Sequence, residues 1–220
     1  ALPIWRAFPV EIRYLPRRGE QRVEGAVAAA IRAALAQDAG SVLAFLPGAG
    51  EIGRTAELLE AALLPRDVRV YPLFGELPLE MQDAAIRPAG AGERKVVLAT
   101  SIAETSLTID GIRIVVDGGL IRAPRFSPRS GMTRLETMRV SRASAEQRRG
   151  RAGRTAPGIC YRLWALEEQA GLLERSTPEI LETDLTSLAL DLAEAGIGDT
   201  ATLRWIDPPP APALAQARSL

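Results

Sequence analysis

The chain has 220 residues, 47% of them hydrophobic and 25% charged, which suits a soluble globular protein with one ordinary domain and a smaller appended part. It has no histidine and one cysteine, Cys160, which excludes histidine-based catalysis, an internal disulfide and a multi-cysteine zinc site. No apolar run approaches the roughly 20 residues that cross a bilayer, and there is no secretory signal, so we expect a cytoplasmic protein without membrane contact.

Short apolar runs alternate with segments of helical periodicity along most of the chain. Continuous apolar runs are typical of strands that are buried on both faces. We expect strands at 8–15, 41–46, 68–74, 95–100, 112–117 and 159–164. We expect helices at 23–35, 55–64, 79–86, 102–107, 143–151, 166–173 and 185–195. This alternation predicts an α/β fold in which helices cover both faces of a parallel sheet.

The α/β pattern is interrupted between Gly118 and Ser141. There, polar residues alternate with Leu, Phe, Met and Val around Pro128-Arg129-Ser130-Gly131, which predicts an inserted antiparallel β-hairpin at about 118–141. Beyond the last helix, three prolines at 208–210 indicate a linker or the opening of another module. The chain starts at Ala1 and its alanine-rich end reads as truncated, so we expect a fragment or a processed chain. We place the main domain at 1–180 and a second region at 181–220.

The net charge of zero conceals a strongly basic stretch at residues 122–154. It holds ten arginines and only two acids, Glu136 and Glu146, so it carries a net charge of +8. A local basic strip on a neutral protein favours binding of a polyanion such as a nucleic acid. The alternative is a solvated face, because arginine is frequent throughout this chain.

Residues 48–55 are similar to the phosphate-binding pattern G-x-x-x-x-G-K-[ST], but Arg54 replaces the lysine. The single lysine, Lys95, stands directly before an apolar run and not in a glycine loop. We therefore interpret residues 41–64 as a strand, loop and helix without nucleotide contact, in which Arg54 is solvated at the start of the helix. A degenerate phosphate loop with its own ATPase activity is the weaker alternative.

The strongest chemical signal is SAEQRRGRAGR at residues 144–154. Spacings of four and three predict that Gln147, Arg151 and Arg154 share one helical face. An amide beside two guanidinium groups suits a triphosphate, because arginine stays charged and binds phosphate oxygens in pairs. Gly150 and Gly153 each cost a helix roughly 1 kcal/mol, which indicates close approach by another backbone or a phosphate. An exposed basic helix that forms surface ion pairs is the alternative.

A second polar cluster follows the strand expected at 95–100. Thr100 and Ser101 fall at the carboxyl end of this strand, where ligands bind to parallel sheets, and their hydroxyl and N–H groups suit phosphates of a nucleic-acid backbone. Thr105, Ser106 and Asp110 follow before the next strand. The alternative is simple capping of the strand end, with an Asp-Gly turn at 110–111.

In this order, ATSIAETSLTIDGIRIVVDGG and QRRGRAGR resemble motifs V and VI of the DEAH-box helicases of superfamily 2. FLPGAGEI is similar to their motif IV, and YPLFGELPLEMQ, GICYRLW and the stretch from PEILETDLTSLALDLAEAGI to IDPPP also fit that family. The resemblance spans about residues 8–210. The FLPG variant is similar to the bacterial HrpB branch of the family.

The resemblance implies a second RecA-like domain, followed at 181–220 by the start of a winged-helix region. The phosphate loop and the D-E-x-H box belong to the first, N-terminal RecA-like domain, which would be the partner of this chain. ATP would bind between the two domains, with Mg²⁺ held mainly by the first. Single-stranded RNA would cross both domains, and the fragment alone would be inactive.

The resemblance also implies catalytic roles around the nucleotide. Gln147 would contact the γ-phosphate, and Arg151 and Arg154 would be arginine fingers. Asp110 would face the ribose or a metal-bound water. Thr105 and Ser106 would couple the nucleotide state to the grip on RNA.

Further implied roles concern the base and the nucleic acid. Ile86 or Arg87 would cover the base where many family members place an aromatic residue, so we expect loose nucleobase selectivity. The residues that would bind RNA are Gly48, Thr100, Ser101, Thr105 and the hairpin arginines Arg122 and Arg125. A non-catalytic module that binds nucleic acid or a protein through the 122–154 strip is the alternative function.

Overall fold

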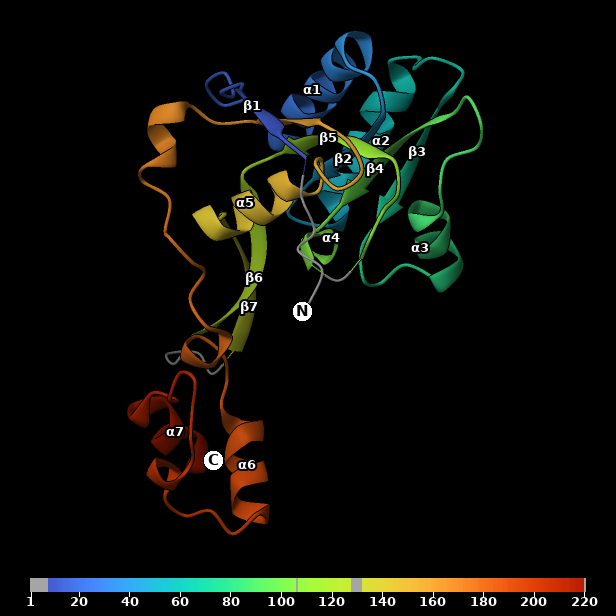
Figure 1. Ribbon diagram of the computed structural model, residues 1–220. Helices are drawn as coiled ribbons and strands as arrows, with labels where there is room; N and C mark the ends of the chain where they lie inside the picture. Colours follow the sequence, from blue (N-terminus) through green and yellow to red (C-terminus); the bar gives the residue numbers. More distant parts are fainter. Residues whose placement is uncertain (1–7, 106, 128–131, 220) are drawn as a thin grey trace. The chain divides into compact units, whose positions relative to one another are not determined.

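The computed structural model describes residues 8–105, 107–127 and 132–219 (Figure 1). The described residues form two compact units. The first contains residues 8–121 and Met138–Arg175, and the second contains Arg122–Thr137 and residues 176–219. The domain boundary at 180 and the winged-helix assignment of 181–220 remain predictions.

The first unit is built on a sheet of six parallel strands in the order β1-β8-β5-β2-β4-β3. The strands are β1 (Val10–Tyr14), β2 (Ser41–Phe45), β3 (Val68–Leu73), β4 (Arg94–Ala99), β5 (Ile112–Asp117) and β8 (Gly158–Arg162). All five residues of β2 are buried, as a central strand of a covered parallel sheet requires. The predicted α/β fold with a parallel sheet is therefore confirmed.

Helices cover both faces of this sheet. They are α1 (Val23–Gln37), α2 (Ala49–Ala61), α3 (Leu79–Ile86), α4 (Ile102–Thr105) and α5 (Arg142–Gly150). Helices α1 and α2 pack on one face through residues such as Ile31 and Ile52 against Val42 and Leu98. Ala85 of α3 and Ala103 of α4 belong to the core of the other face. Residues next to one another in a strand thus enter different cores.

Two predicted helices differ from the structure. The helix expected at 55–64 begins at Ala49, because Ile52, Thr55 and Leu59 are buried at helical spacing although Gly50 and Gly53 lie in the same segment. The helix expected at 166–173 is only a 3-10 turn at Leu166–Gln169. Its leucines do not form a helical stripe: Leu172 is buried, whereas Leu166 and Leu173 are exposed.

The predicted hairpin is present as β6 (Leu120–Ser127) and β7 (Met132–Arg139), which form a two-stranded sheet. Because only four residues join them, the strands run antiparallel. The turn, including Arg129, lies outside the described residues. Residues 122–137 belong to the second compact unit, in which the N–H of Phe126 donates to the carbonyl of Glu182 at 2.9 Å.

The rest of the second unit is helical. It contains α6 (Thr186–Glu194), α7 (Ala211–Arg218) and 3-10 turns at Glu179–Leu181 and Thr200–Thr202. Helix α7 was not expected from the alanine-rich tail; it begins after the prolines at 208–210, and its Leu214 packs with Leu185 and Leu192. Across the described residues, no helix is both long and apolar enough to cross a membrane.

Candidate functional site

Helix α5 holds the first of the three residues predicted to share a helical face. Ser141 caps the helix by accepting a hydrogen bond from the N–H of Ser144 at 3.2 Å, and the helix ends at Gly150. Arg151 therefore caps the C-terminus, and Arg154 lies beyond it. The predicted stripe is wrong as a helical surface, because the chain turns before it reaches the second arginine.

Arg151 and Arg154 nevertheless line one small crevice together with Leu43, Leu107 and Ile112. Arg151 is buried; its Nε donates to the carbonyl of Glu104 at 2.8 Å and its Nη1 to the carbonyl of Leu107. Its Nη2 is buried without a hydrogen-bond partner among the described residues. Burial, and then the charge of Arg154, lower the pKa of Arg151 to about 10.

Arg154 is exposed, and its Nη1 donates to Oγ1 of Thr108 at 2.7 Å. Gln147 is exposed on α5 and is not among the described residues that line the crevice. The structure thus brings the two arginines together and leaves Gln147 on the helix surface before them.

The two glycines of this segment have different surroundings. A Cβ added to Gly153 would lie 2.5 Å from the carbonyl oxygen of Phe8, whose N–H donates to the Gly153 carbonyl at 2.8 Å. The predicted backbone approach is confirmed there. At Gly150, an added Cβ would meet no described atom within 4 Å, so the protein itself gives no reason for that glycine.

Gly48, Thr100 and Ser101 lie at the carboxyl edge of the sheet. They follow β2 and β4, which are neighbouring strands with Phe45 opposite Ala99. Ser101 is exposed and Thr100 is half-buried, but Gly48 is buried at the N-cap of α2. Thr105 is exposed at the end of α4, and Ser106 lies outside the described residues.

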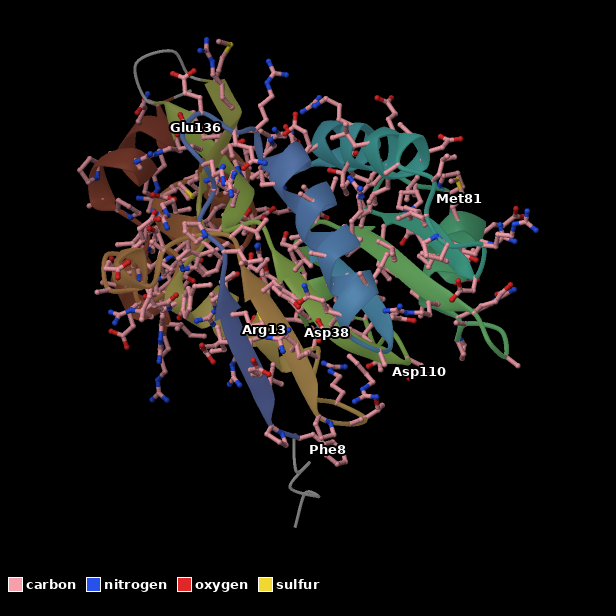
Figure 2. All side chains as sticks on the ribbon, turned by 90° about the horizontal axis from the view of Figure 1, so that it is seen from above. Phe8, Arg13, Asp38, Met81, Asp110 and Glu136 are labelled. Carbon is pink, nitrogen blue, oxygen red and sulfur yellow. The ribbon has the colours of Figure 1, made fainter. Side chains whose placement is uncertain are left out.

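Asp110 lies at the opposite, amino edge of the sheet, directly before β5. Figure 2 shows it at the same end of the sheet as Phe8, which precedes β1. Asp110 is exposed, and Gly111 has a φ of 76°, so the predicted Asp-Gly turn is confirmed. The sheet therefore separates Asp110 from the polar residues at the carboxyl edge.

The segment predicted to cover a base is the end of α3. Ile86, its last residue, is half-buried, and Arg87 is exposed. The ammonium group of Lys95 fixes this end by donating to the carbonyls of Ala84, Ala85 and Arg87 at 2.8, 2.7 and 2.5 Å. Sequence reasoning had noted Lys95 only as a lysine without a phosphate loop.

The phosphate-loop pattern at 48–55 is helical from Ala49 onward, so no glycine loop surrounds a phosphate there. Arg54 stands in the second turn of α2, not at its start as expected. Its Nε donates to Glu24 Oε1 at 2.7 Å and its Nη2 to Glu51 Oε1 at 3.0 Å. The side chain is 46% exposed, so the expected solvated arginine is exposed but ion-paired.

A buried ion cluster around Arg148 was missed by sequence reasoning. Arg148 is 1% exposed; its Nε donates to Glu104 Oε1 at 2.7 Å and its Nη1 to Asp117 Oδ1 at 2.8 Å. Its guanidinium also lies 4.8 Å from the centre of the Phe45 ring. Burial lowers its pKa, but the charges of Asp117 and Glu104 outweigh this, so the pKa of Arg148 is raised. The spacing of Ala145 and Arg148 on the inward face of α5 was the available signal.

The predicted hairpin arginines lie on β6 in the second unit. Arg125 is exposed, and its Nη1 donates to Glu136 Oε2 at 3.4 Å. Arg122 is half-buried and donates from Nε to Thr137 Oγ1 at 3.4 Å. The exposed faces of both strands thus carry part of the basic strip.

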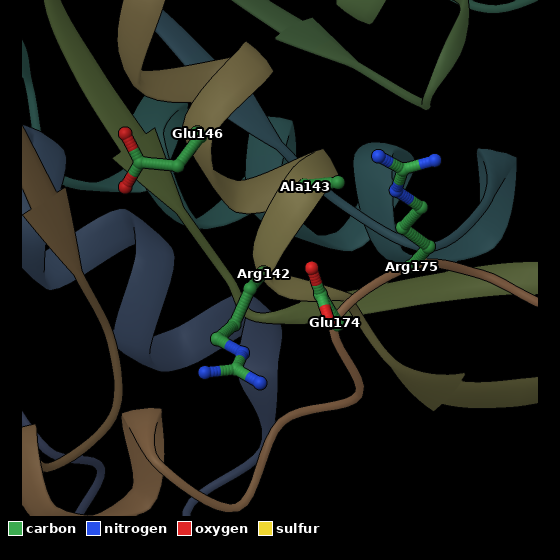
Figure 3. Close-up of a pocket in the computed structure, with 5 residues that line it drawn as sticks. All are labelled: Arg142, Ala143, Glu146, Glu174 and Arg175. Carbon is green, nitrogen blue, oxygen red and sulfur yellow. The ribbon is translucent and has the colours of Figure 1, made fainter.

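Figure 3 shows an open pocket beside the start of α5 that no prediction addressed. It is lined by Arg142, Ala143, Glu146, Glu174 and Arg175, so its charges balance. The N–H groups of Arg142 and Ala143 already donate to the carbonyls of Leu173 and Glu174, at 2.8 and 3.0 Å. The pocket therefore lacks free helix N-terminal donors at these two positions. Over the described ranges, no group of three or more acidic, cysteine or histidine side chains is placed to hold a metal.

Residues 26–156 match the family described as the helicase conserved C-terminal domain. The ATP-dependent RNA helicase HrpB of Escherichia coli (strain K12) is 52% identical over 215 residues, which cover 98% of this chain and 26% of that protein. The pre-mRNA-splicing factor ATP-dependent RNA helicase prp22 of Schizosaccharomyces pombe is 40% identical over 212 residues, which cover 94% of this chain and 18% of that protein.

Two solved structures are similar over nearly the whole chain. The crystal structure of E. coli DExH-box NTPase HrpB gives a TM-score of 0.90, with 97% of this chain and 26% of that chain covered at 52% identity. The crystal structure of Escherichia coli DEAH/RHA helicase HrpB gives a TM-score of 0.92, with 97% and 27% covered at 52% identity. The chain thus spans about a quarter of the length of these HrpB relatives.

Proposed function

The chain belongs to the helicase conserved C-terminal domain family, and we propose that it is the second RecA-like domain of an ATP-dependent RNA helicase. The DEAH-box resemblance and its HrpB character agree with the 52% identity to HrpB. One observation supports the proposal beyond family membership: Arg151 and Arg154 line one crevice, and Nη2 of Arg151 is buried without a hydrogen-bond partner among the described residues. The positive charge of Arg154 contributes to the lowered pKa of Arg151, and a polyanion bound beside both groups would offset this repulsion.

The chemistry of the donors in this region supports a triphosphate as the proposed ligand. Nη2 of Arg151 is buried and unpartnered among the described residues, and Arg154 and Gln147 present exposed donors. A guanidinium group in a partly desolvated crevice interacts more strongly with phosphate than one in bulk water. Gln147, Arg151 and Arg154 are therefore our candidates for the catalytic contacts, with Asp110 and Ser106 at the nucleotide as further candidates.

In this proposal, ATP and Mg²⁺ are held mainly by the N-terminal RecA-like domain of the same protein. Phosphoryl transfer spreads negative charge over the transferred group in the transition state. Arginine fingers stabilise that charge and raise the rate of hydrolysis by a factor of about 10³–10⁵. Because these arginines belong to a separate domain, hydrolysis depends on closure of the two domains. Closure is then the step that couples hydrolysis to movement on RNA.

The RNA path in this proposal follows the carboxyl edge of the sheet. Thr100 and Ser101 would hold phosphates of single-stranded RNA, and Thr105 would link them to the nucleotide. Gly48 would line the same path, and Arg122 and Arg125 of the second unit are further proposed contacts of the RNA. We also assign the complete protein to the cytoplasm, in keeping with RNA as its substrate.

Base recognition is proposed to be loose. Ile86 and Arg87 would cover the base without an aromatic surface, so stacking would contribute little. We expect comparable turnover of ATP, GTP and CTP by the complete protein in parallel NTPase assays. A strict preference for ATP would show that another part of the protein selects the base.

The central experiment replaces Arg154 by alanine in the complete protein. We expect RNA-stimulated ATP hydrolysis to fall by about 10³-fold or more, while RNA affinity without nucleotide stays close to that of the unmodified protein. Arg113→Ala is the matched control, because Arg113 is also exposed and donates from Nε to the carbonyl of Pro157, near the same loop. The control should leave hydrolysis intact.

A non-catalytic binding module predicts another result for the same variant. In that case Arg154→Ala would weaken RNA binding and reduce its dependence on salt, because one phosphate contact would be lost. Hydrolysis by the complete protein would then stay unchanged, and the arginine-finger role would be excluded.

A further inference from the structure

Arg148 lies next to the proposed nucleotide contacts, but its burial keeps it from touching a substrate. It follows Gln147 directly in α5, and it is 1% exposed. Its guanidinium joins three elements: α5 itself, α4 through Glu104, and the end of β5 through Asp117. A side chain in this position acts on the site only through the elements that it holds.

The first link joins α4 to the end of α5 through Glu104, which accepts hydrogen bonds at its carboxylate and at its backbone carbonyl. Arg148 binds the carboxylate of Glu104 with Nε and Nη2, both at 2.7 Å. Arg151 binds the backbone carbonyl of Glu104 with Nε at 2.8 Å. Since α4 has four residues, its own hydrogen bonds do not keep it folded in water. Arg148 of α5 and Arg151 at its C-cap therefore help to fix the position of α4, together with Ala103 in the core.

Helix α4 is in turn hydrogen-bonded to Thr100 and Ser101 at the carboxyl edge of the sheet. The N–H of Glu104 donates to the carbonyl of Ser101 at 2.9 Å, and the N–H of Ala103 donates to that of Thr100 at 3.3 Å. A displacement of α5 is thus transmitted over one helical turn to Thr100 and Ser101. No other described hydrogen bond of a side chain joins Glu104 to α5.

The second link is rigid. Asp117 is fully buried at the end of β5, where its Oδ1 also accepts from the N–H of Gly119 at 2.9 Å. Arg148 Nη1 further donates to the carbonyl of Leu120 at 3.2 Å. The planar fork of arginine allows one side chain to reach both carboxylates, which the single nitrogen of lysine does not. One end of the bridge is therefore anchored in the sheet and the other holds the short helix.

We propose that Arg148 is a positioning residue that couples the nucleotide contacts of α5 to the nucleic-acid contacts of Thr100 and Ser101. The inference rests on the proposed function for the identity of both ligands. It predicts that loss of the bridge reduces communication between the sites more than it reduces either binding event.

The test compares Arg148→Lys with Arg162→Lys in the complete protein. Arg162 is an equally buried arginine, 2% exposed, which pairs with Glu146 at 2.6 Å and touches no residue of α4 among its described contacts. The readout is the ratio of NTP hydrolysis with saturating RNA to hydrolysis without RNA. We expect Arg148→Lys to lower this ratio about tenfold and Arg162→Lys to leave it unchanged, although both lower the melting temperature.

A second variant covers the case in which Arg148→Lys does not fold. Glu104→Gln keeps an oxygen acceptor of the same length but removes the charge, so it should fold and lower the ratio about threefold. RNA affinity measured with and without a non-hydrolysable ATP analogue should show the same loss of coupling.

Each outcome decides the proposal. An unchanged ratio in Arg148→Lys and in Glu104→Gln, with a lowered melting temperature, would show a purely structural role and overturn it. An equal loss of the ratio in Arg162→Lys would also overturn it, since the effect would then come from destabilisation. Failure of the unmodified complete protein to hydrolyse NTP in response to RNA would refute the proposed function and this inference together.

Discussion

Two of the buried cations of the first unit, Arg148 and Lys95, are compensated by different kinds of partner. Arg148 is neutralised by carboxylates from two elements, α4 and the end of β5. Lys95 is 3% exposed and has no carboxylate within ion-pair distance among its described contacts. Three backbone carbonyls at the end of α3 surround its ammonium group, and the Tyr71 ring lies 4.6 Å away. Burial accordingly lowers the pKa of Lys95.

The difference explains why a lysine suits position 95 in a chain that otherwise has 26 arginines. At the end of α3, three acceptors converge on one atom, and an ammonium group has three donors on a single nitrogen. Around Arg148, the acceptors lie on both sides of a planar group, which suits the arginine fork. The geometry of the acceptors, more than the charge, determines which cation each place accepts.

The largest effect is expected where a buried charge loses its partner. Asp117→Ala would leave Arg148 buried with one carboxylate in place of two, at a cost of about 3–5 kcal/mol in the free energy of unfolding. Urea unfolding followed by the fluorescence of the buried Trp164 would measure it. Glu104→Ala should cost less, because the Glu104 side chain is 11% exposed and water replaces part of the lost contact. Equal stability of Asp117→Ala and the unmodified chain would contradict the assigned bridge.

A smaller effect is expected at Lys95, where the lost partners are neutral. Lys95→Met would leave three carbonyls of the α3 end without their donor, a loss of about 1–3 kcal/mol. Lys95→Arg should be destabilised as well. The donors of a guanidinium group are spread over a plane, so they do not match three carbonyls that converge on one nitrogen, and the larger group does not fit the buried site. Circular dichroism during urea unfolding of both variants would test this. An arginine variant as stable as the unmodified chain would refute the geometric explanation.

Local patterns in the sequence predicted the elements of the fold, but they did not predict the surroundings of individual cations. The six strands and α3 were predicted closely because each is a local pattern of apolar residues with clear ends. The arginines of 144–154 were recognised by their type, but their different surroundings were not. Arg148, Arg151 and Arg154 look alike in the sequence, but their surroundings in the fold differ. The first is buried, the second is buried with one nitrogen unpartnered among the described residues, and the third is exposed.

The start of α2 was predicted too late because the glycines before residue 55 were interpreted as part of a loop. Gly48, Gly50 and Gly53 suggested a loop, yet the buried stripe of Ile52, Thr55 and Leu59 keeps the segment helical. Tertiary burial overrides the low helix propensity of glycine in such a case. Lys95 was missed for a related reason: its partners are backbone carbonyls, which carry no signal in a sequence.

The smallest effect is expected at a cation that stays exposed, Arg54. Its partner Glu24 is 7% exposed; burial raises the pKa of Glu24, but hydrogen bonds from its own backbone and from Arg54 outweigh this and lower it. A carboxylate with a lowered pKa stabilises the folded state above its unfolded pKa, and this contribution is lost as the pH falls through the folded pKa.

Arg54→Met should therefore reduce stability only slightly at pH 7, and the difference from the unmodified chain should vanish in acid as Glu24 becomes protonated. High salt at pH 7 should shrink the difference as well, because 46% of the Arg54 side chain is exposed to screening ions. Urea unfolding at pH 7 and at acid pH, with and without salt, would measure both dependences. Arg32→Met on the exposed surface of α1 is the control and should show neither. A loss of stability that persists in acid would show that Arg54 stabilises the fold through the packing of its alkyl chain. Its contribution would then not depend on its charge, in contrast to those of Arg148 and Lys95.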